Sequence, residues 1–237
     1  MKNTHIIKKL AGAVLASSMV AGVTAQAADV VIGVPNWPSV QVTANVLKVV
    51  MEDNLGVEVE LQNGTNPVVF EAMDKGSMHV HPEVWLPNQT NLHDKFVKDK
   101  KSVVMNGNGI PAFQGMCVTK GTAESTGIKK LSDLTDPDIA AKFDTDGDGK
   151  GEIWIGAAGW ASTNVEKIRA KSYGYDTTMN LKEMDETLAL AEVDTAVTQK
   201  KPIVFFCYTP HHMFALHELV VLEEPKHDPE KWKVIQP

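Results

Sequence analysis

Four aromatic residues follow short apolar segments that have the character of β-strands: Trp37, Trp85, Trp160 and Tyr208. In open α/β sheets, ligands bind beyond the ends of the strands, so these four rings can converge on one site. Ring faces attract a desolvated quaternary ammonium ion by cation–π interaction, worth about 2 kcal/mol or more for a well-placed ring. One such ring alone is more often a core or surface residue, but the repeated placement predicts an aromatic site for a methylated cation.

Residues 151–164 place one of these rings beside the start of a helix. The segment has the pattern of a short strand, a glycine-rich turn with Trp160 at its tip, and a helix that begins near Ala161 and Ser162. The first N–H groups of a helix have no partner within it and favour a negative group. We therefore expect the backbone at Ala161 and Ser162 to hold the anionic end of a small ligand, whose cation would lie against Trp160.

Glu83 is the carboxylate closest to this predicted site along the sequence. If the Glu83 side chain faces the ligand, it would favour a cation without a carboxylate of its own, such as choline, or a protonated N-oxide. The alternative is a solvated glutamate on the surface, which is the usual place for this residue type.

An acidic loop precedes the Trp160 segment. Three aspartates alternate with other residues, two of them glycines, and a glutamate follows. Oxygen ligands at this spacing suit Ca²⁺, although Ile155 occupies the position of the bidentate glutamate of an EF-hand loop and cannot bind a metal. A solvated acidic turn is the alternative. The ion would be structural, and no other cofactor is expected. The predicted metal-binding residues are Asp144, Asp146, Asp148, Lys150 and Glu152.

Two pairs of histidines could indicate a zinc site instead. His79 and His81 alternate on a predicted strand, and His211 is next to His212. No third ligand has the spacing of a zinc site, so structural histidines are the better interpretation. An exported metal-dependent enzyme that uses the acidic loop and these histidines is the first alternative function.

The composition narrows the classes of partner. The chain has 237 residues, of which 43% are hydrophobic and 22% charged, and its formal net charge is −7. This composition is typical of a globular protein with one large domain or two small lobes. The negative charge argues against binding to nucleic acid or to an anionic membrane surface. We therefore expect a small-molecule ligand and no nucleic acid partner.

The N-terminus has the pattern of a secretory signal peptide. Lysines at positions 2, 8 and 9 precede an apolar run over residues 10–23, and residues 25–27 form a small-x-small cleavage site. The run is shorter than the roughly 20 residues that a membrane span needs, so we prefer a signal peptide to a transmembrane anchor. We predict cleavage after Ala27 and a soluble periplasmic protein. In that compartment Cys117 and Cys207 could form a disulfide, while two buried thiols fit their apolar segments equally well.

Strands and helices alternate along the chain, which predicts an α/β architecture with parallel-rich sheets flanked by helices. The predicted strands are residues 30–34, 57–61, 78–81, 102–105, 116–119, 153–155, 202–207 and 220–222. The predicted helices are residues 39–54, 67–74, 89–98, 137–143, 162–173, 182–199 and 211–219. We divide the chain into a signal peptide at 1–27, a first lobe at 28–112, a second lobe at 113–219, and the start of a return segment toward the first lobe at 220–237.

The segments that carry these rings resemble a known family. Residues 84–88, 159–162 and 205–210, with the acidic loop at 144–150, are similar to segments of the substrate-binding proteins of glycine betaine/proline betaine ABC importers. The resemblance covers most of residues 30–222. It implies a two-lobed periplasmic binding protein fold (type II-like) that closes on a methylated amine and presents it to an ABC permease in the inner membrane.

The same resemblance implies roles for individual residues. Trp85, Trp160 and Tyr208 would form an aromatic box around the trimethylammonium group, and the backbone of Ala161 and Ser162 would bind the carboxylate. The pattern of strand ends adds Trp37 to this box. No covalent chemistry, and hence no enzymatic activity, is expected.

The chain departs from the family pattern at several places. Tyr208 stands where close relatives have tryptophan, and Ala158 and Ser162 flank the second tryptophan where relatives carry a disulfide. Relatives are longer, with a C-terminal segment that rejoins the first lobe, so we expect that a C-terminal part is missing here. The identity of the ligand stays open. The candidates are glycine betaine, trimethylamine N-oxide, choline, carnitine and dimethylsulfoniopropionate. A binding protein for an unrelated metabolite, such as an amino acid, is the second alternative function.

Overall fold

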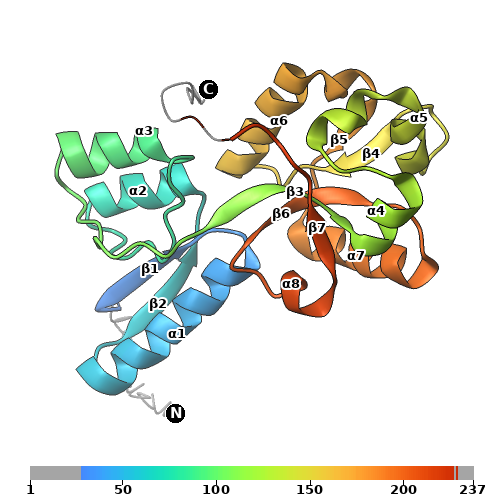
Figure 1. Cartoon of the computed structure of the whole chain (residues 1–237). Helices are drawn as coiled ribbons and strands as arrows, with labels where there is room; N and C mark the ends of the chain where they lie inside the picture. Colours follow the sequence, from blue (N-terminus) through green and yellow to red (C-terminus); the bar gives the residue numbers. More distant parts are fainter. Residues whose placement is uncertain (1–27, 227, 229–237) are drawn as a thin grey trace, which may run out of the picture.

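Two separate sheets organise the computed structural model of this chain, which describes residues 28–226 and residue 228. We call the part built on the two-stranded sheet the first lobe and the part built on the five-stranded sheet the second lobe (Figure 1). The predicted signal peptide at 1–27 lies outside the described residues, as does most of 227–237. Within the described part of the chain, no helix has the length and apolar character needed to cross a membrane.

The first lobe pairs β1 (Val30–Val34) with β2 (Val59–Asn63) in parallel. The long helix α1 (Pro38–Leu55) connects them, beginning at a proline that suits the first turn of a helix and ending at Gly56, whose φ of 66° is left-handed. The chain continues through α2 (Asn66–Asp74), α3 (Thr90–His93) and a π-helical turn (Asp94–Asp99). Phe70, Phe96 and Val103 form a small core beneath these helices.

Two predicted strands of the first lobe are absent from its sheet. The predicted strand at 78–81 makes a single bridge, between Val80 and Ile32. It ends there because Pro82 has no N–H group with which to extend the pairing. The predicted strand at 102–105 is also wrong, since the N–H groups of Ser102 and Val103 both donate to the carbonyl of Phe96 and fold the chain onto the π-helical turn.

The second lobe contains a mixed sheet with the strand order β5-β4-β6-β3-β7. Its strands are β3 (Phe113–Thr119), β4 (Gly151–Trp154), β5 (Met179–Lys182), β6 (Val204–Thr209) and β7 (Leu219–Val221). β4 is parallel to β5 and β6, whereas β3, the strand by which the chain enters this lobe, is antiparallel to β6 and β7. The sheet is therefore less parallel than the strand–helix alternation suggested. The predicted boundary between residues 219 and 220 falls inside β7.

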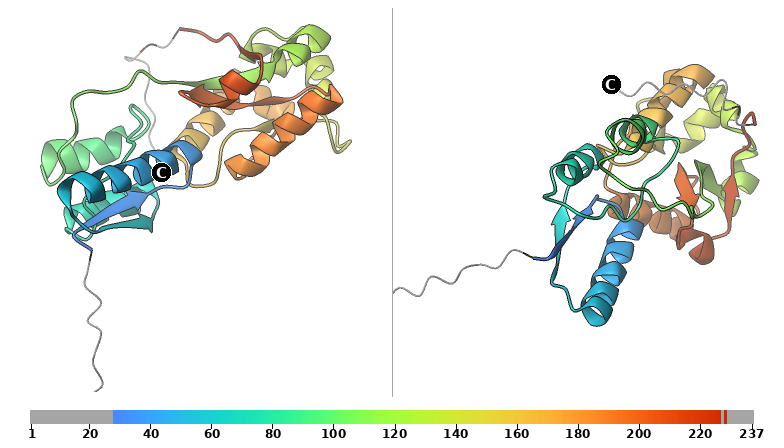
Figure 2. Two further views of the ribbon diagram at one scale, coloured as in Figure 1. Left: turned by 90° about the horizontal axis from the view of Figure 1, so that it is seen from below. Right: turned by 90° about the vertical axis from the view of Figure 1, so that its left-hand side faces the viewer.

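Helices and short turns surround this second sheet. The left-hand view of Figure 2 shows the two lobes side by side, with the segment before β3 passing between them. The predicted helix at 182–199 begins later, at Glu186, because Asp185 caps it by accepting a hydrogen bond from the Thr187 N–H. The helices are α4 (Lys120–Thr126), α5 (Pro137–Ala140), α6 (Ala161–Tyr173), α7 (Glu186–Gln199) and α8 (Met213–Leu216).

A disulfide joins Cys117 of β3 to Cys207 of β6. Both cysteines are buried in the middle of the second sheet, with Cα atoms 5.7 Å apart. The structure thus decides between the two alternatives that the sequence left open, and a disulfide fits an exported protein.

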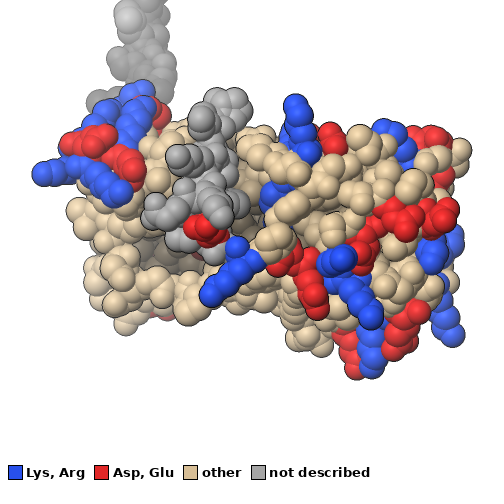
Figure 3. All heavy atoms as spheres, turned by 45° about the horizontal axis from the view of Figure 1, so that its top comes forward, with Lys and Arg blue, Asp and Glu red and all other residues tan. Residues whose placement is uncertain are grey.

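Surface charge is mixed rather than segregated on the face seen in Figure 3. Acidic and basic side chains are interspersed there, mainly over the second lobe. A surface of this kind offers no single-sign patch for a polyanion on that face, in keeping with the net charge of −7.

Candidate functional site

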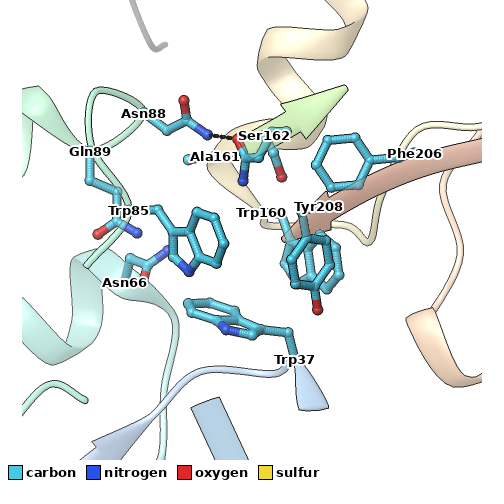
Figure 4. Close-up of a pocket in the computed structure, with 11 residues that line it drawn as sticks. Trp37, Asn66, Trp85, Asn88, Gln89, Trp160, Ala161, Ser162, Phe206 and Tyr208 are labelled. Atoms are coloured by element: carbon cyan, nitrogen blue, oxygen red, sulfur yellow. Dashed lines mark hydrogen bonds between the residues drawn. The ribbon is translucent and has the colours of Figure 1, made fainter. Parts of the chain in front are cut away.

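A hollow between the two lobes encloses about 370 Å³ of empty space, part of it open to solvent. Figure 4 shows aromatic and carboxamide side chains around it, those of the first lobe facing those of the second. None of the described residues that line it is charged. They are Trp37, Asn66, Trp85, Asn88, Gln89, Gln114, Trp160, Ala161, Ser162, Phe206 and Tyr208.

Aromatic rings from both lobes meet edge to face around this hollow. Trp37 of the first lobe lies 6.3 Å from Trp160 of the second, centroid to centroid, with an interplanar angle of 83°. Trp85 and Tyr208 form a similar pair at 5.5 Å and 85°. The structure therefore brings together all four rings that the sequence singled out. Phe206, which the sequence analysis missed, adds a fifth ring; it lies two residues before Tyr208 on β6 and so on the same face, and that period of two was the available signal.

Each of three rings is held from behind through its polar atom, which leaves its faces for a ligand. Trp37 Nε1 donates to Glu83 Oε2 at 2.8 Å, and Trp160 Nε1 donates to Asn36 Oδ1 at 3.1 Å. The Tyr208 hydroxyl donates to Glu186 Oε1 at 2.8 Å. A buried ring with its polar group satisfied in this way has a fixed orientation.

Glu83 does not line the hollow. Its carboxylate lies behind Trp37 and also accepts hydrogen bonds from Ser39 Oγ at 3.0 Å and Thr43 Oγ1 at 2.9 Å. These bonds tie the start of α1 to the segment that leads to Trp85. Glu83 thus positions the indole of Trp37, and the structure does not place it against the ligand space.

Tyr208 is a protonated donor at neutral pH. Burial raises the pKa of its hydroxyl, and the carboxylate of Glu186 raises it further. Glu186 is itself only 1% exposed, and it is the first residue of α7, where the helix start favours a negative charge. His211 Nε2 lies 3.2 Å from the same carboxylate oxygen. The side chain of Tyr208, which lines the hollow, is therefore held in place by the buried carboxylate of Glu186.

Ala161 and Ser162, at the start of α6, line the hollow. Trp160 is the N-cap residue and makes no side-chain capping bond, so the first N–H groups of the helix have no cap from their own segment. The turn before it needs glycine at position 156, where φ is 117° and a Cβ would lie 2.4 Å from Thr163 Oγ1. Thr163 Oγ1 in turn donates to the carbonyl of Ala157 at 2.7 Å.

Four carboxamides complete the lining: Asn66, Asn88, Gln89 and Gln114. The sequence analysis missed all four. Asn88 and Gln89 follow directly after the aromatic segment that contains Trp85, which was a usable signal, whereas nothing in the sequence marked Asn66 or Gln114. Asn88 Nδ2 donates to Gln114 Oε1 at 2.6 Å and so links the first lobe to β3.

The acidic loop lies away from the hollow. Oxygen atoms of Asp144, Asp146, Asp148 and Glu152 lie within 4.8 Å of one another. Several of them already accept hydrogen bonds: Asp144 from the N–H groups of Gly147 and Gly149, and Asp148 from Asn180, a bond that lowers the pKa of Asp148. Lys150 contributes its N–H group, which donates to Asp148 Oδ1 at 2.9 Å.

The histidine pairs do not form a metal centre among the described residues, where only the acidic loop has three or more such ligands close together. His79 Nδ1 accepts a hydrogen bond from the N–H of Val31, and His81 contacts Asn66. The rings of His211 and His212 contact each other at a tilt of 34°, with their centroids 4.4 Å apart. These contacts are those of structural side chains.

Residues 28–231 match the family described as the substrate-binding domain of ABC-type glycine betaine transport systems. The glycine betaine-binding periplasmic protein OusX of Dickeya dadantii is 30% identical over 127 residues, which is 54% of this chain and 38% of that protein. The glycine betaine/proline betaine-binding periplasmic protein of Escherichia coli is 28% identical over 131 residues, with the same two shares. The chain thus spans well under half the length of these relatives.

Solved structures confirm the predicted fold. The binding protein ProX of a glycine betaine/L-proline ABC transporter from Borrelia burgdorferi superposes with a TM-score of 0.68 at 24% identity, over 83% of this chain and 69% of that one. Lactococcal OpuAC superposes with a TM-score of 0.64 at 22% identity, over 83% and 70%. The family match covers nearly all of the described residues, and this chain therefore belongs to the family of substrate-binding domains of ABC-type glycine betaine transport systems.

Proposed function

We propose that this chain captures a small methylated cation, of the quaternary ammonium or related osmolyte class, in the hollow between its lobes. The observation that carries the proposal is the composition of the hollow. Aromatic rings from both lobes surround it, and in the part of the chain that the structure describes no charged side chain lines it. A permanently charged cation cannot be neutralised by proton transfer, so ring faces are the suitable replacement for its water shell.

The cation would lie among Trp37, Trp85, Trp160 and Tyr208. Each well-placed and desolvated ring contributes about 2 kcal/mol. Glu83 and Glu186 add a negative field from behind two of these rings, because each accepts a hydrogen bond from a ring donor. Their carboxylates are separated from the ligand by the rings, so they favour a cation without forming an ion pair with it.

The other end of the ligand would meet the start of α6. The N–H groups of Ala161 and Ser162 are the donors, and the positive end of the helix dipole favours an anion there. A trimethylammonium group and a carboxylate in one small molecule match the two ends of the hollow. This match supports glycine betaine as the first ligand to test.

The structural neighbours support a small set of candidate ligands. Lactococcal OpuAC was solved in complex with glycine betaine, and another neighbour, with a TM-score of 0.65 and 20% identity, is a choline-binding protein in complex with choline. Trimethylamine N-oxide, carnitine and dimethylsulfoniopropionate share the methylated cation or sulfonium group and complete the panel.

Isothermal titration calorimetry of the full chain against this panel tests the proposal. We expect saturable binding of at least one member, with quenching or shift of tryptophan fluorescence as the rings contact the cation. Arginine and glutamine serve as controls for an unrelated amino acid ligand. Binding of these amino acids, with no response to any methylated compound, would refute the proposal.

The proposed place of action is the periplasm, with delivery to an ABC permease in the inner membrane. The support is the signal-peptide pattern at 1–27, the disulfide, and the periplasmic relatives. Expression in a Gram-negative host, followed by mass measurement of the periplasmic protein, tests the export step. The expected mature N-terminus is Ala28.

The structural Ca²⁺ predicted for the acidic loop stays a prediction. Like charges that lie this close repel one another, and a divalent cation would relieve the repulsion. The hydrogen bonds that the same oxygens accept within the loop are the competing explanation for its shape. Thermal unfolding in Ca²⁺ and in EDTA separates the two. A higher melting temperature in Ca²⁺ than in EDTA, abolished by Asp146→Asn, would support a bound ion. Equal melting temperatures in Ca²⁺ and in EDTA would support an acidic turn that binds no ion.

A further inference from the structure

Asn66 lines the hollow, but it is not one of the aromatic residues that would surround the cation. It is the first residue of α2, three residues after the last residue of β2, and only 5% of it is exposed. Figure 4 shows it on the same wall as Trp85 and Gln89. A buried amide at a ligand site can present either its oxygen or its nitrogen, and which one decides what it can bind.

His81 settles the direction of this amide. His81 Nδ1 accepts a hydrogen bond from the N–H of Glu83 at 3.3 Å, so the proton of the neutral ring is on Nε2. Nε2 lies 2.9 Å from Asn66 Oδ1 and therefore donates to it. The opposite tautomer would place the Nδ1 proton against the N–H of Glu83. Because Oδ1 is engaged by His81, the free end of the Asn66 amide is the donor Nδ2.

The ring of His81 is held firmly enough to impose this direction. It packs against Phe70, with ring centroids 5.4 Å apart. Burial lowers the pKa of His81 to about 4, so the ring carries one proton over the physiological range. Among the described residues, no group accepts a hydrogen bond from Asn66 Nδ2.

Other donors line the same hollow, from the second lobe. The N–H groups at the start of α6 belong to it, and Gln114, whose Oε1 accepts from Asn88, has its Nε2 left to donate. The lining, as far as residues 28–226 supply it, thus offers several neutral donors and no cationic side chain. Such a set fits the oxygen of a carboxylate or N-oxide.

We propose that Asn66 donates a hydrogen bond to the anionic end of the ligand and that His81 is a positioning residue that fixes the Asn66 amide in the donor orientation. The inference rests on the proposed function and assigns to its ligand an anionic or oxide group. Because Asn66 belongs to the first lobe and α6 to the second, one anion that reaches both would be held from both lobes.

Two ligands distinguish the contribution of the anionic group to binding from the contribution of the cation. Glycine betaine carries both, and tetramethylammonium carries the cation alone. We expect Asn66→Ala to weaken glycine betaine about 10- to 100-fold, which is the range for a hydrogen bond to a charged group, and to change tetramethylammonium affinity less than twofold. Asn66→Asp should weaken glycine betaine more than Asn66→Ala does. Asn45→Ala, on the exposed face of α1, is the matched control and should bind like the wild type.

The role of His81 is tested by loss and rescue. His81→Phe removes the donor and should weaken glycine betaine as much as Asn66→Ala does. His81→Gln places an amide nitrogen near the position of Nε2 and should restore most of the affinity. A merely structural role for His81 would give similar losses in both variants. Melting temperatures of all variants verify that each is folded at the titration temperature.

The outcomes distinguish this inference from the proposed function. A wild type that binds none of the methylated compounds refutes both. A wild type that binds tetramethylammonium but not glycine betaine refutes the inference alone, as does an Asn66→Ala variant that loses affinity for both probes equally or for neither. If tetramethylammonium binds too weakly to measure, the comparison of His81→Phe with His81→Gln tests the inference instead. Equal affinities of these two variants for glycine betaine would refute the positioning role of His81.

Discussion

At the scale of single residues, Trp85 gives the sharpest test of the cation–π contribution. It is half-buried, lines the hollow and faces Tyr208, so truncation should change binding more than folding. We expect Trp85→Ala to weaken glycine betaine about 30-fold, the equivalent of about 2 kcal/mol. Trp85→Phe keeps a ring face and should lose about fivefold or less. Calorimetric titration of both variants measures this, and equal losses in the two would contradict a ring-face interaction.

The same scale shows what the sequence could and could not reveal about the site. Trp37, Trp85, Trp160 and Tyr208 were predictable because each follows an apolar strand-like segment, and strand ends lie at ligand crevices. Glu83 was not placed correctly, because its role depends on Ser39 and Thr43, which lie on a helix more than 35 residues earlier. The direction of an amide such as Asn66 depends on the tautomer of a histidine, which no local pattern encodes.

At the scale of elements, α6 is anchored by a buried charge cluster in its middle turns. Arg169 pairs with Glu166 of the same helix and with Glu224, which follows β7 in the sequence. Burial raises the pKa of Glu166 to about 7, although the positive charge of Arg169 lowers it. The cluster holds the helix whose start faces the ligand.

This cluster predicts a dependence of stability on pH. The folded pKa of Glu166 lies above its ordinary value of 4.5, so the folded chain binds this proton more tightly than the unfolded chain does. The resulting contribution to the free energy of unfolding, on the order of a few kcal/mol, is complete below pH 4.5 and is lost as pH rises through about 7. We expect urea unfolding between pH 5 and 8 to show this decline in the wild type.

Glu166→Gln should flatten that decline, because the variant has no proton to lose. Glu192→Gln, at an exposed position of α7, is the control and should keep the wild-type slope. His81 contributes in the opposite sense, since its pKa is lowered to about 4 and its share of the stability is lost as pH falls. That share is common to wild type and variants, so the difference between them isolates Glu166. An unchanged slope in Glu166→Gln would contradict the assignment.

The second prediction at the scale of elements concerns the contribution of the disulfide to stability. The disulfide joins β3 and β6 over a sequence separation of 90 residues, and a cross-link of that span restricts the unfolded chain strongly. Replacing both cysteines with alanine should reduce the free energy of unfolding by about 2–5 kcal/mol. Urea titration of the double variant, compared with the wild type with and without reductant, measures the loss. Wild type in reductant should behave like the variant, and a variant as stable as the oxidised wild type would contradict the prediction.

Elements were predictable where the chain's own pattern decided them, and less so where tertiary pairing did. α1, α6 and β6 follow directly from helical spacing, a glycine turn and a continuous apolar run. The segments at 78–81 and 102–105 have strand-like composition, but Pro82 and the carbonyl of Phe96 redirect their backbone. The direction of β3 relative to β6 was not predictable, since a crossover between lobes can enter a sheet either way.

At the scale of the whole molecule, the two lobes touch across the hollow. Trp37 contacts Trp160, Trp85 contacts Tyr208, and two hydrogen bonds, from Trp160 Nε1 to Asn36 and from Asn88 to Gln114, cross between the lobes. This is the arrangement of a closed binding protein. Closure and binding are then coupled, because a ligand that contacts both lobes favours the closed state over the open one.

Asn36 allows closure to be separated from ligand contact. It is exposed and does not line the hollow, and among the described residues its hydrogen bond to the second lobe is the one it accepts from Trp160 Nε1. Asn36→Ala should therefore shift the lobes toward the open state and weaken every ligand alike, by about fivefold for one hydrogen bond of about 1 kcal/mol. Asn36→Asp keeps an acceptor and should recover most of the loss. Titrations with glycine betaine and tetramethylammonium measure the effect, and small-angle X-ray scattering follows the opening. If Asn36→Ala weakened glycine betaine alone, as we expect of Asn66→Ala, Asn36 would belong to the anion site and not to the closure of the lobes.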